Sequence, residues 1–382
     1  MKIAIILGTR PEAIKMAPLI LAAKKANIKL VVVATAQHRY MLDQLLEVFK
    51  IKLDYDLNIM TPEQTLSEIS IRVMGRMDRL LKKEAPDLIL VQGDTITAFI
   101  SSLTAFYHKI PIAHIEAGLR TYNKYYPFPE EINRQLIDVL ADFYFVPTRQ
   151  NQKNLLSEGK PKEKIFVTGN TVIDALLYIS KKNYPFKNKS LNKINFKNKK
   201  IILLTCHRRE SFGKKIESIF RGIRKIADEF DNIEFIYPVH LNPHVQKPAQ
   251  KILSKHPGIH LIKPLIYSDM VKLMKNCYLV VTDSGGLQEE APTFNKPVLV
   301  LRNETERVEG VKVGTLKLIG TDKKRVYQGI KRLLENKKEY QKMARAKNPY
   351  GDGQAAKRIV KIILNANKSS LLKKELNKKI KA

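Results

Sequence analysis

Three carboxylates lie at or near the predicted carboxyl ends of strands, where they could act as general acids and bases. Asp94 and Glu116 each follow a short apolar run, and Glu130 precedes a helical pattern in the segment 127–131. Acids that converge in a cleft raise one another's pKa, which suits proton transfer near neutral pH. Any one of them could instead cap a helix or serve a structural role. Their occurrence on strand-end loops favours a catalytic set.

Basic side chains occupy comparable positions and could bind a phosphate group. His207 follows an apolar run and precedes Arg208 and Arg209, so it is a candidate general acid or phosphate partner, with a structural histidine as the alternative. Arg10 lies beside a predicted helix N-terminus, whose free N–H groups favour anions. Lys15 lies further along that helix, and an ordinary exposed lysine is the alternative there.

A glycine turn and a capping box mark two predicted helix starts. Residues 283–286, Asp-Ser-Gly-Gly, follow an apolar run and are typical of a phosphate-cradling turn, although they form neither a Walker A loop nor a GxGxxG fingerprint. Glu290 would lie about one and a half turns into that helix, where it could hold ribose hydroxyls or be a surface acid. Thr9 and Glu12 fit a capping box.

Metal-ligand patterns are weak in this sequence. His240 and His244 have the i, i+4 spacing of a helical metal pair, but Asn242 and Pro243 interrupt it and no HExxH glutamate is present. Residues 54–56, Asp-Tyr-Asp, match the D-x-D tripeptide of metal-using glycosyltransferases, which also occurs often by chance. We therefore expect no metal site.

Two series of short apolar runs alternate with helical patterns, which predicts two parallel sheets with helices on both faces. The first series comprises residues 3–7, 30–35, 88–92, 112–115, 143–146 and 165–168. The second comprises residues 201–205, 233–237, 259–262, 278–282, 297–301 and 316–319. In such sheets ligands bind beyond the carboxyl ends of the strands, so the chemical residues of both series should point to one cleft.

The two series predict an α/β fold with two doubly wound, Rossmann-like domains facing across a cleft. The first domain spans residues 1–180 and carries the carboxylates, and a Lys/Asn-rich linker follows at 181–200. The second domain spans residues 201–353. The region 354–382 begins with a helical pattern.

Length and cysteine content limit the class of protein. The chain has 382 residues, enough for two domains that each bury about 70% of their unfolded surface. Cys206 and Cys277 are the only cysteines, which excludes a disulfide scaffold and favours a cytoplasmic setting. The first apolar run, 3–7, is far shorter than the ~20 residues of a membrane helix, so we expect neither a membrane span nor export.

The formal net charge is +31, from 68 Lys and Arg against 37 Asp and Glu. Lysines concentrate in 181–200 and 368–382, where a solvated linker and tail is the simplest interpretation and a nucleic-acid-binding arm the alternative. No zinc-finger spacing, RNP-like aromatic motif or heptad pattern accompanies them, so we expect no nucleic-acid partner. A basic protein also suits an anionic small substrate such as a nucleotide sugar.

Eight motifs occur in order over about residues 3 to 310. They are Gly8-Thr9-Arg10-Pro11-Glu12-Ala13-Ile14-Lys15, Gln37-His38-Arg39, Gly93-Asp94-Thr95, His114-Ile115-Glu116-Ala117-Gly118-Leu119-Arg120, Pro129-Glu130-Glu131-x-Asn133-Arg134, Thr168-Gly169-Asn170, His207-Arg208-Arg209-Glu210-Ser211 and Asp283-Ser284-Gly285-Gly286-x-Gln288-Glu289-Glu290-Ala291-Pro292. Together they closely resemble the motifs of the non-hydrolysing UDP-N-acetylglucosamine 2-epimerases.

This resemblance implies the two-domain GT-B architecture, with the last helix crossing back toward the N-terminal domain. It implies interconversion of UDP-GlcNAc and UDP-ManNAc by a homodimer, as a supply for cell-surface polysaccharide. The residues that it assigns to acid–base catalysis are Asp94, Glu116 and Glu130, with His207 stabilising the departing diphosphate. The residues that it assigns to substrate binding are Arg10, Lys15, Arg134, Asn170, Arg208, Ser284, Gly285, Gly286 and Glu290.

The chemistry of this family explains the need for several carboxylates. The C2 proton has no adjacent carbonyl, so the family eliminates UDP to give a 2-acetamidoglucal and then adds UDP back with the proton on the other face. This route requires an acid and a base on opposite faces of C2. Fixed cations and dipoles of the enzyme stabilise the charge that develops in the transition state. The route uses neither NAD nor a metal. Closure of the two domains would protect the intermediate from hydrolysis.

Two positions depart from the family pattern. Many members have a second UDP-GlcNAc site that activates them, and the matching region here is Gln37, His38, Arg39, Tyr40 and Glu63. A carboxylate at Glu63, where a cation would meet a diphosphate, argues against substrate activation. Where members often have an aromatic residue against uracil, this chain has Met270, which can pack on the base but cannot stack as a ring.

Three other functions remain as alternatives. An inverting GT-B glycosyltransferase would share the fold and the UDP pocket, but it needs only one catalytic base. A hydrolysing epimerase would release free ManNAc and UDP. A nucleic-acid binder would rest on the charge alone.

Overall fold

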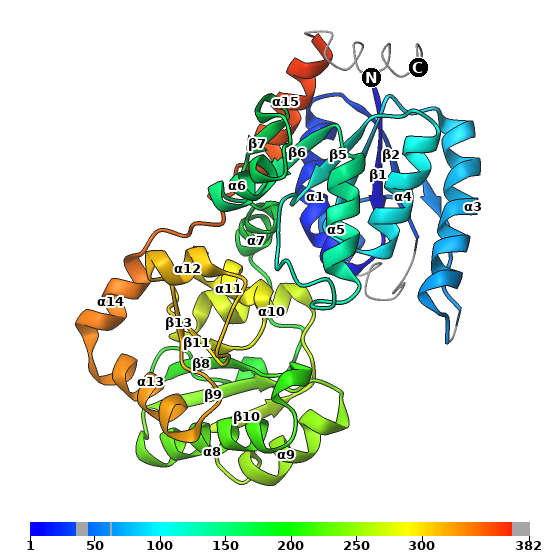
Figure 1. Cartoon of the computed structure of the whole chain (residues 1–382). Coiled ribbons are helices and arrows are strands. Elements are labelled where there is room, and N and C mark those ends of the chain that lie inside the picture. The colour runs from blue at the N-terminus through cyan, green and yellow to red at the C-terminus, as the bar shows by residue number, and fades with distance from the viewer. Residues whose placement is uncertain (36–44, 62, 369–382) are drawn as a thin grey trace. The chain divides into compact units, whose positions relative to one another are not determined.

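The computed structural model describes residues 1–35, 45–61 and 63–368, and it divides into two compact units (Figure 1). Unit 1 comprises Met1–Ala175 and the chain from Tyr350 onward, and unit 2 comprises Leu176–Pro349. Within the described residues, no helix combines the length and the apolar character that crossing a bilayer requires.

Unit 1 is built on a parallel sheet of seven strands in the order β3-β2-β1-β4-β5-β6-β7. The strands are β1 (Lys2–Leu7), β2 (Lys29–Ala34), β3 (Tyr55–Asp56), β4 (Leu88–Gln92), β5 (Ile112–Ile115), β6 (Phe143–Val146) and β7 (Ile165–Val167). The chain runs outward from β1 to β2 and β3 and then returns to β4 on the other side of β1. The carboxyl ends of β1 and β4 therefore flank a topological switch point, where doubly wound sheets bind their ligands.

Helices cover the apolar strands of unit 1, which are buried on both faces. They are α1 (Arg10–Lys25), α3 (Leu66–Glu84), α4 (Ile96–Tyr107), α5 (Glu130–Leu140), α6 (Arg149–Ser157) and α15 (Ala355–Lys368). Helix α7 (Thr171–Ser180) begins in unit 1 and ends in unit 2. The C-terminal helix α15 packs against α1. Asp174 fixes its start by accepting hydrogen bonds from the backbone N–H of Ala355 at 3.2 Å and of Ala356 at 2.9 Å.

Unit 2 contains a second parallel sheet, of six strands in the order β10-β9-β8-β11-β12-β13. Its strands are β8 (Lys200–Thr205), β9 (Ile233–Pro238), β10 (Ile259–Ile262), β11 (Leu279–Thr282), β12 (Val298–Val300) and β13 (Leu316–Leu318). Its helices are α8 (Lys214–Glu229), α9 (Pro243–Leu253), α10 (Tyr267–Asn276), α11 (Gly285–Glu290), α12 (Val308–Val313), α13 (Lys323–Glu335) and α14 (Lys337–Arg345). The predicted α/β fold with two doubly wound sheets is confirmed, and the switch point of this sheet lies between β8 and β11.

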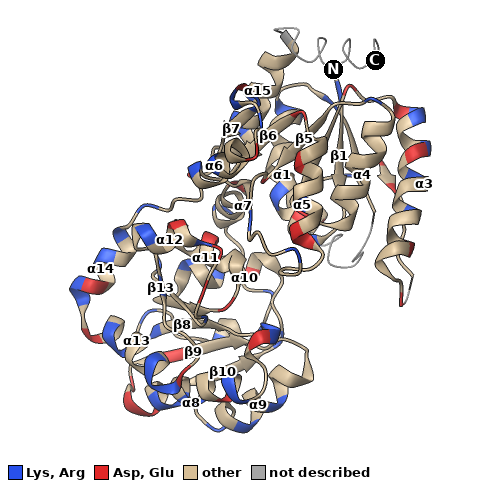
Figure 2. Ribbon diagram, viewed as in Figure 1, with Lys and Arg blue, Asp and Glu red and all other residues tan. Residues whose placement is uncertain are grey.

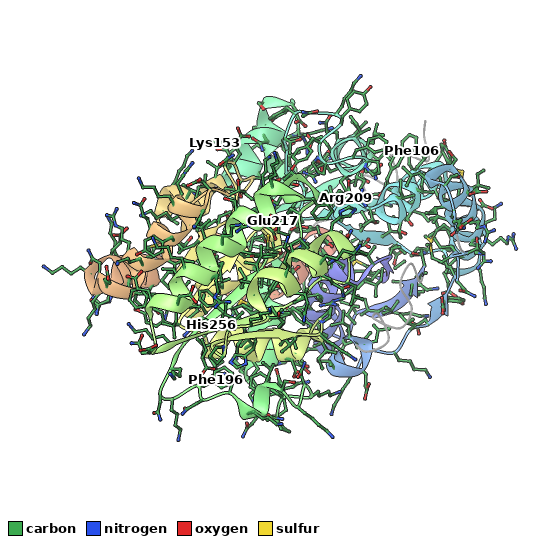
Figure 3. All side chains as sticks on the ribbon, turned by 90° about the horizontal axis from the view of Figure 1, so that it is seen from below. Phe106, Lys153, Phe196, Arg209, Glu217 and His256 are labelled. Carbon is green, nitrogen blue, oxygen red and sulfur yellow. The ribbon has the colours of Figure 1, made fainter. Side chains whose placement is uncertain are left out.

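Residues 181–200, which we expected to be a linker, belong to unit 2 and are held by specific contacts. The buried carboxylate of Asp269 accepts a hydrogen bond from the backbone N–H of Asn188 at 2.8 Å. Phe186 stacks on Phe196, labelled in Figure 3, with ring centroids 5.6 Å apart. Most lysines of this segment are exposed, and Lys200 begins β8.

Candidate functional site

Glu116 is the centre of a polar cluster at the carboxyl edge of the unit 1 sheet. It follows β5 with a φ of 68°, and the residue is 7% exposed. The Lys15 ammonium lies 2.5 and 2.7 Å from its two carboxylate oxygens. The side-chain amide of Asn170 donates to Oε1 at 2.8 Å, and the amide of Gln92 donates to Oε2. The structure thus brings together the predicted residues Lys15, Glu116 and Asn170.

Asp94, on the turn after β4, is held from α5. The Arg134 guanidinium donates to its Oδ2, and the side-chain amide of Asn133 donates to its backbone carbonyl at 3.0 Å. The Asp94 side chain is 28% exposed and that of Arg134 11% exposed. Arg134, which the resemblance assigns to substrate binding, is therefore in direct contact with one of the predicted acids.

Glu130 has a buried carboxylate oxygen without a protein partner among the described residues. It is the first residue of α5, and its Oε2 is buried without a hydrogen bond in the described structure. Its neighbour Glu131 is fully buried and accepts backbone N–H groups of Thr121 at 3.1 Å and Tyr122 at 3.0 Å. The loop before α5 is therefore fixed by Glu131, which leaves Glu130 an oxygen that can accept a proton.

Glu12 connects the loops that follow β1 and β4. Its Oε2 accepts the backbone N–H of Thr9 at 2.6 Å, in the predicted capping box, and its Oε1 accepts the Thr95 hydroxyl at 2.9 Å. Burial raises the pKa of Glu12 to about 7, against the lowering effect of these hydrogen bonds. Arg10, two residues earlier, begins α1 and is half-buried.

The switch point of unit 2 is organised by Asp283, a fully buried carboxylate after β11. Its Oδ2 accepts the backbone N–H groups of His207 at 2.6 Å and Arg208 at 2.8 Å, and Nδ1 of His207 lies 3.2 Å from its Oδ1. The His207 side chain is 38% exposed and stacks on His240, with centroids 5.6 Å apart. Burial and the adjacent His207 lower the pKa of His240.

The glycine turn after β11 is packed on one side and open on the other. Ser284 is the N-cap residue of α11, and a Cβ at Gly285 would lie 2.9 Å from the guanidinium carbon of Arg307. At Gly286 the nearest atom would be the Ser284 hydroxyl oxygen, 3.9 Å away. Glu290 ends the helix, is 7% exposed, and accepts the Tyr267 hydroxyl at 3.3 Å. Glu290 is therefore not the surface acid that was the alternative in the sequence.

Of the positions matching the family's second substrate site, Gln37, His38, Arg39 and Tyr40 lie outside the described residues. Glu63 is exposed and has a φ of 56° in the turn before α3. Among the described residues, no group of three or more His, Cys, Asp or Glu side chains could hold a metal ion.

Several polar residues of the site were not predicted. Gln92, Asn133, His114 and Asp138 all contact a predicted residue or its turn, and all are buried. Gln92 and His114 had a readable signal, because each is a polar residue inside an otherwise apolar strand. Asn133 lies in one of the eight motifs but was given no role there. Asp138 had no signal, because α5 also has polar residues that do not contact the site.

Comparison with known proteins places this geometry in a family. A sequence profile described as UDP-N-acetylglucosamine 2-epimerase matches residues 21–364. The UDP-N-acetylglucosamine 2-epimerase of Bacillus subtilis is 52% identical over 365 residues, which cover 95% of each chain.

Two solved structures have a similar fold. One is the UDP-GlcNAc 2-epimerase from Neisseria meningitidis bound to UDP-GlcNAc, with 49% identity, a TM-score of 0.88, and coverage of 96% of this chain and 100% of that chain. The other is the S. aureus MnaA–UDP co-structure, with 53% identity, a TM-score of 0.86, and coverage of 95% and 97%. The chain belongs to the UDP-N-acetylglucosamine 2-epimerase family.

Proposed function

We propose that this enzyme interconverts UDP-GlcNAc and UDP-ManNAc by eliminating UDP and adding it back. The observation that carries the proposal is the group of three carboxylates, Asp94, Glu116 and Glu130, around the carboxyl edge of one sheet. Family membership supports the reaction, and the UDP-GlcNAc and UDP in the related structures support the substrate. We infer that the product supplies cell-surface polysaccharide synthesis in the cytoplasm.

In the elimination step, the C1–O bond breaks and its electron pair leaves with the β-phosphate of UDP. A carboxylate removes the C2 proton, and the C2–H electron pair forms the C1=C2 double bond of a 2-acetamidoglucal. Positive charge develops at C1 and is stabilised by carboxylates of unit 1. In the return step the phosphate oxygen attacks C1, and an acid on the opposite face of the ring delivers a proton to C2. Separate carboxylates are needed because one group cannot reach both faces.

Unit 2 provides the groups that stabilise the leaving diphosphate. His207 and Arg208 bring side chains that can be cationic, and Asp283 fixes their backbone. The open glycine turn at Gly286 lets a phosphate approach the start of α11. We assign ribose binding to the buried carboxylate of Glu290. These donors are fixed before reaction, so they stabilise charge without reorganisation.

Incubation with UDP-GlcNAc in deuterated water tests the proposal. We expect deuterium at C2 of both UDP-GlcNAc and UDP-ManNAc, measured by NMR and mass spectrometry. A glycosyltransferase without acceptor would exchange nothing and form no UDP-ManNAc. A hydrolysing epimerase would release free ManNAc and UDP in equal amounts. Either of these results would replace the proposed reaction.

We also infer that the enzyme is a homodimer that associates through α4 and α5 of unit 1. Ile132, Leu136 and Val139 form an exposed apolar row along α5, at 37%, 38% and 67% exposure. Phe106, labelled in Figure 3, and Tyr107 are exposed at the end of the neighbouring α4. Helix α4 has no charged residue, although 27% of the chain is charged (Figure 2). Contiguous apolar surface of this kind marks protein interfaces.

Light scattering across a concentration series tests the interface. We expect a dimer for the wild type and a monomer for Val139→Lys, because a lysine ammonium buried between two apolar surfaces is costly. Val313→Lys, at a residue of unit 2 that is 47% exposed, is the matched control and should remain dimeric. A Val139→Lys protein that stays dimeric at the lowest concentration would rule out this surface.

A further inference from the structure

His114 is a fully buried histidine whose two ring nitrogens both contact acceptor atoms. It is the third residue of β5, two positions before Glu116. Nδ1 lies 2.6 Å from Oδ1 of Asp138 on α5, and Nε2 lies 2.7 Å from the backbone carbonyl oxygen of Gly93. A carbonyl oxygen can only accept a hydrogen bond, so Nε2 must carry a proton.

The Asp138 carboxylate is also an acceptor, so Nδ1 must carry a proton as well. The pKa of Asp138 lies below its usual value: burial raises it, but His114 and Arg120 lower it further than burial raises it. An ionised Asp138 cannot donate to the ring. A histidine between two acceptors is the doubly protonated imidazolium, and the adjacent carboxylate compensates its charge.

Asp138 is in turn paired on its other oxygen. Its Oδ2 accepts the backbone N–H of Gly118 at 3.2 Å, and the Arg120 guanidinium lies 2.8 Å away. The side chain of Arg120 is fully buried and donates from two nitrogens to Glu158, each at 2.7 Å. The four charged groups therefore alternate in sign from the centre of unit 1 to the partly exposed Glu158. Each buried charge has an opposite partner, which burial requires.

This chain of charges is attached to both turns that carry predicted acids. Nε2 of His114 contacts the backbone carbonyl oxygen of Gly93, the residue before Asp94. The backbone N–H of Gly93 donates to the carbonyl oxygen of Ile115 at 3.0 Å. Asp138 holds the N–H of Gly118, two residues after Glu116. Gly93 and Gly118 both have positive φ, at 70° and 77°, so these turns have no regular secondary structure to fix them.

We propose that His114 and Asp138 are positioning residues that fix the Asp94 and Glu116 turns relative to each other. The proposal rests on the proposed function, which gives Asp94 and Glu116 their role in proton transfer. The groups facing His114 are Asp138 from α5, Tyr144 beside it in β6 and the Gly93 turn after β4. Arg120, from the loop after β5, pairs with Asp138. Misplacing catalytic groups by about 1 Å lowers turnover by about 10²-fold, so the turns must be held firmly.

Nitrogen NMR of the full-length, ¹⁵N-labelled protein tests the charge state without any variant. We expect both His114 nitrogens to show the protonated shift at neutral pH, because each contacts an acceptor atom. The signals are assigned by their absence in His114→Gln. A single-tautomer neutral signal for His114 at neutral pH would overturn the imidazolium. This measurement is independent of activity, so it stands even if the proposed reaction fails.

Kinetics of His114→Gln test the positioning role. We expect kcat for UDP-ManNAc formation and for C2 deuterium exchange to fall together by about 10- to 100-fold. KM for UDP-GlcNAc and the Kd of UDP should change by less than about threefold, because UDP contacts are proposed for unit 2. The control is His108→Gln, since His108 also bonds an aspartate, Asp78, at 2.8 Å but contacts neither turn.

Equal kcat for the two variants would remove the positioning role. A proportional loss of kcat and UDP affinity in His114→Gln would also remove it, because that pattern indicates general damage to the fold. If the wild type itself exchanges no deuterium at C2, the proposed reaction fails instead, and the two failures are thereby distinguished.

Discussion

Unit 1 contains two Lys–Glu ion pairs of nearly equal length at opposite edges of one sheet. At the carboxyl edge the Lys15 ammonium lies 2.5 Å from Glu116, and at the amino edge the Lys2 ammonium lies 2.6 Å from Glu84. All four side chains are largely buried, with 6–23% of their surface exposed. Ion-pair geometry alone therefore does not distinguish a catalytic carboxylate from a structural one.

The two glutamates differ in what surrounds them. Glu84 ends α3, and its other partner is the Tyr55 hydroxyl. The hydrogen bonds from Lys2 and Tyr55 lower the pKa of Glu84. Glu116 lies in a left-handed turn beyond a strand end and accepts from the side-chain amides of Gln92 and Asn170. The carboxyl edge is where parallel sheets bind ligands, so the Glu116 pair lies where a substrate is expected and the Glu84 pair does not.

The largest effect should come from removing the charge of each glutamate in turn. We expect Glu116→Gln to lower kcat by about 10²-fold or more, the usual contribution of a positioned acid or base. Asp94→Asn and Glu130→Gln should have effects of similar size. Glu84→Gln should keep wild-type kcat and lose only thermal stability. Steady-state kinetics and thermal unfolding of the four variants make the comparison. Wild-type kcat in Glu116→Gln would show that the two pairs are equivalent.

The sequence predicted the location of this site better than its contacts. Apolar runs and the rule for parallel strands placed Asp94 and Glu116 at one edge, since that inference needs only strand order and direction. The contact of Lys15 with Glu116 could not be predicted from the sequence, because it depends on the positive φ of Glu116 and on the side-chain conformations of both residues. Arg134 was assigned to substrate from its motif, although the structure places it on Asp94.

Unit 2 also has one acid at the carboxyl edge of its sheet and a similar acid elsewhere. Asp283 and Asp322 each accept two backbone N–H groups, Asp283 in the buried switch point and Asp322 at the exposed N-terminus of α13. We expect Asp283→Asn to weaken UDP binding by about 10-fold, because hydrogen bonds to charged groups contribute about 1.5–3 kcal/mol. Calorimetric titration with UDP measures this.

Asp322→Asn is the matched control, because asparagine is also a good N-cap residue. Its UDP affinity should equal that of the wild type. Equal affinities in Asp283→Asn and the wild type would mean that the backbone of His207 and Arg208 does not depend on the Asp283 charge. The deuterium exchange rate at saturating substrate should change less than the affinity, since the proposed proton-transfer groups belong to unit 1.

A third contrast, which concerns stability instead of activity or binding, is between two capping boxes of the same type in unit 1. Glu12 lies at the carboxyl edge and is buried, and Glu68 lies at the start of α3 and is exposed. Burial raises the pKa of Glu12 to about 7, whereas hydrogen bonds from Thr65 lower the pKa of Glu68. The same capping motif therefore makes stability depend on pH in opposite directions at Glu12 and at Glu68.

The sign of each effect follows from its pKa shift. The folded pKa of Glu12 is above its unfolded value of 4.5, so the stability that it contributes is complete below about pH 4.5 and is lost as the pH rises through about 7. Glu12→Gln mimics the protonated form, so its stability relative to the wild type should rise over that range, by about 1.4 kcal/mol per pKa unit.

Glu68 should behave in the opposite way. Its lowered pKa means that its contribution is complete above the unfolded value of 4.5 and is lost as the pH falls through the folded value. Glu68→Gln should therefore lose stability relative to the wild type mainly above about pH 4.5. Urea unfolding of both variants and the wild type from about pH 4 to about pH 8 measures the two trends. If the stability difference from the wild type changes with pH in the same direction for both variants, burial does not give the two glutamates opposite pKa shifts. Glu12 would then have no distinct electrostatic environment at the carboxyl edge.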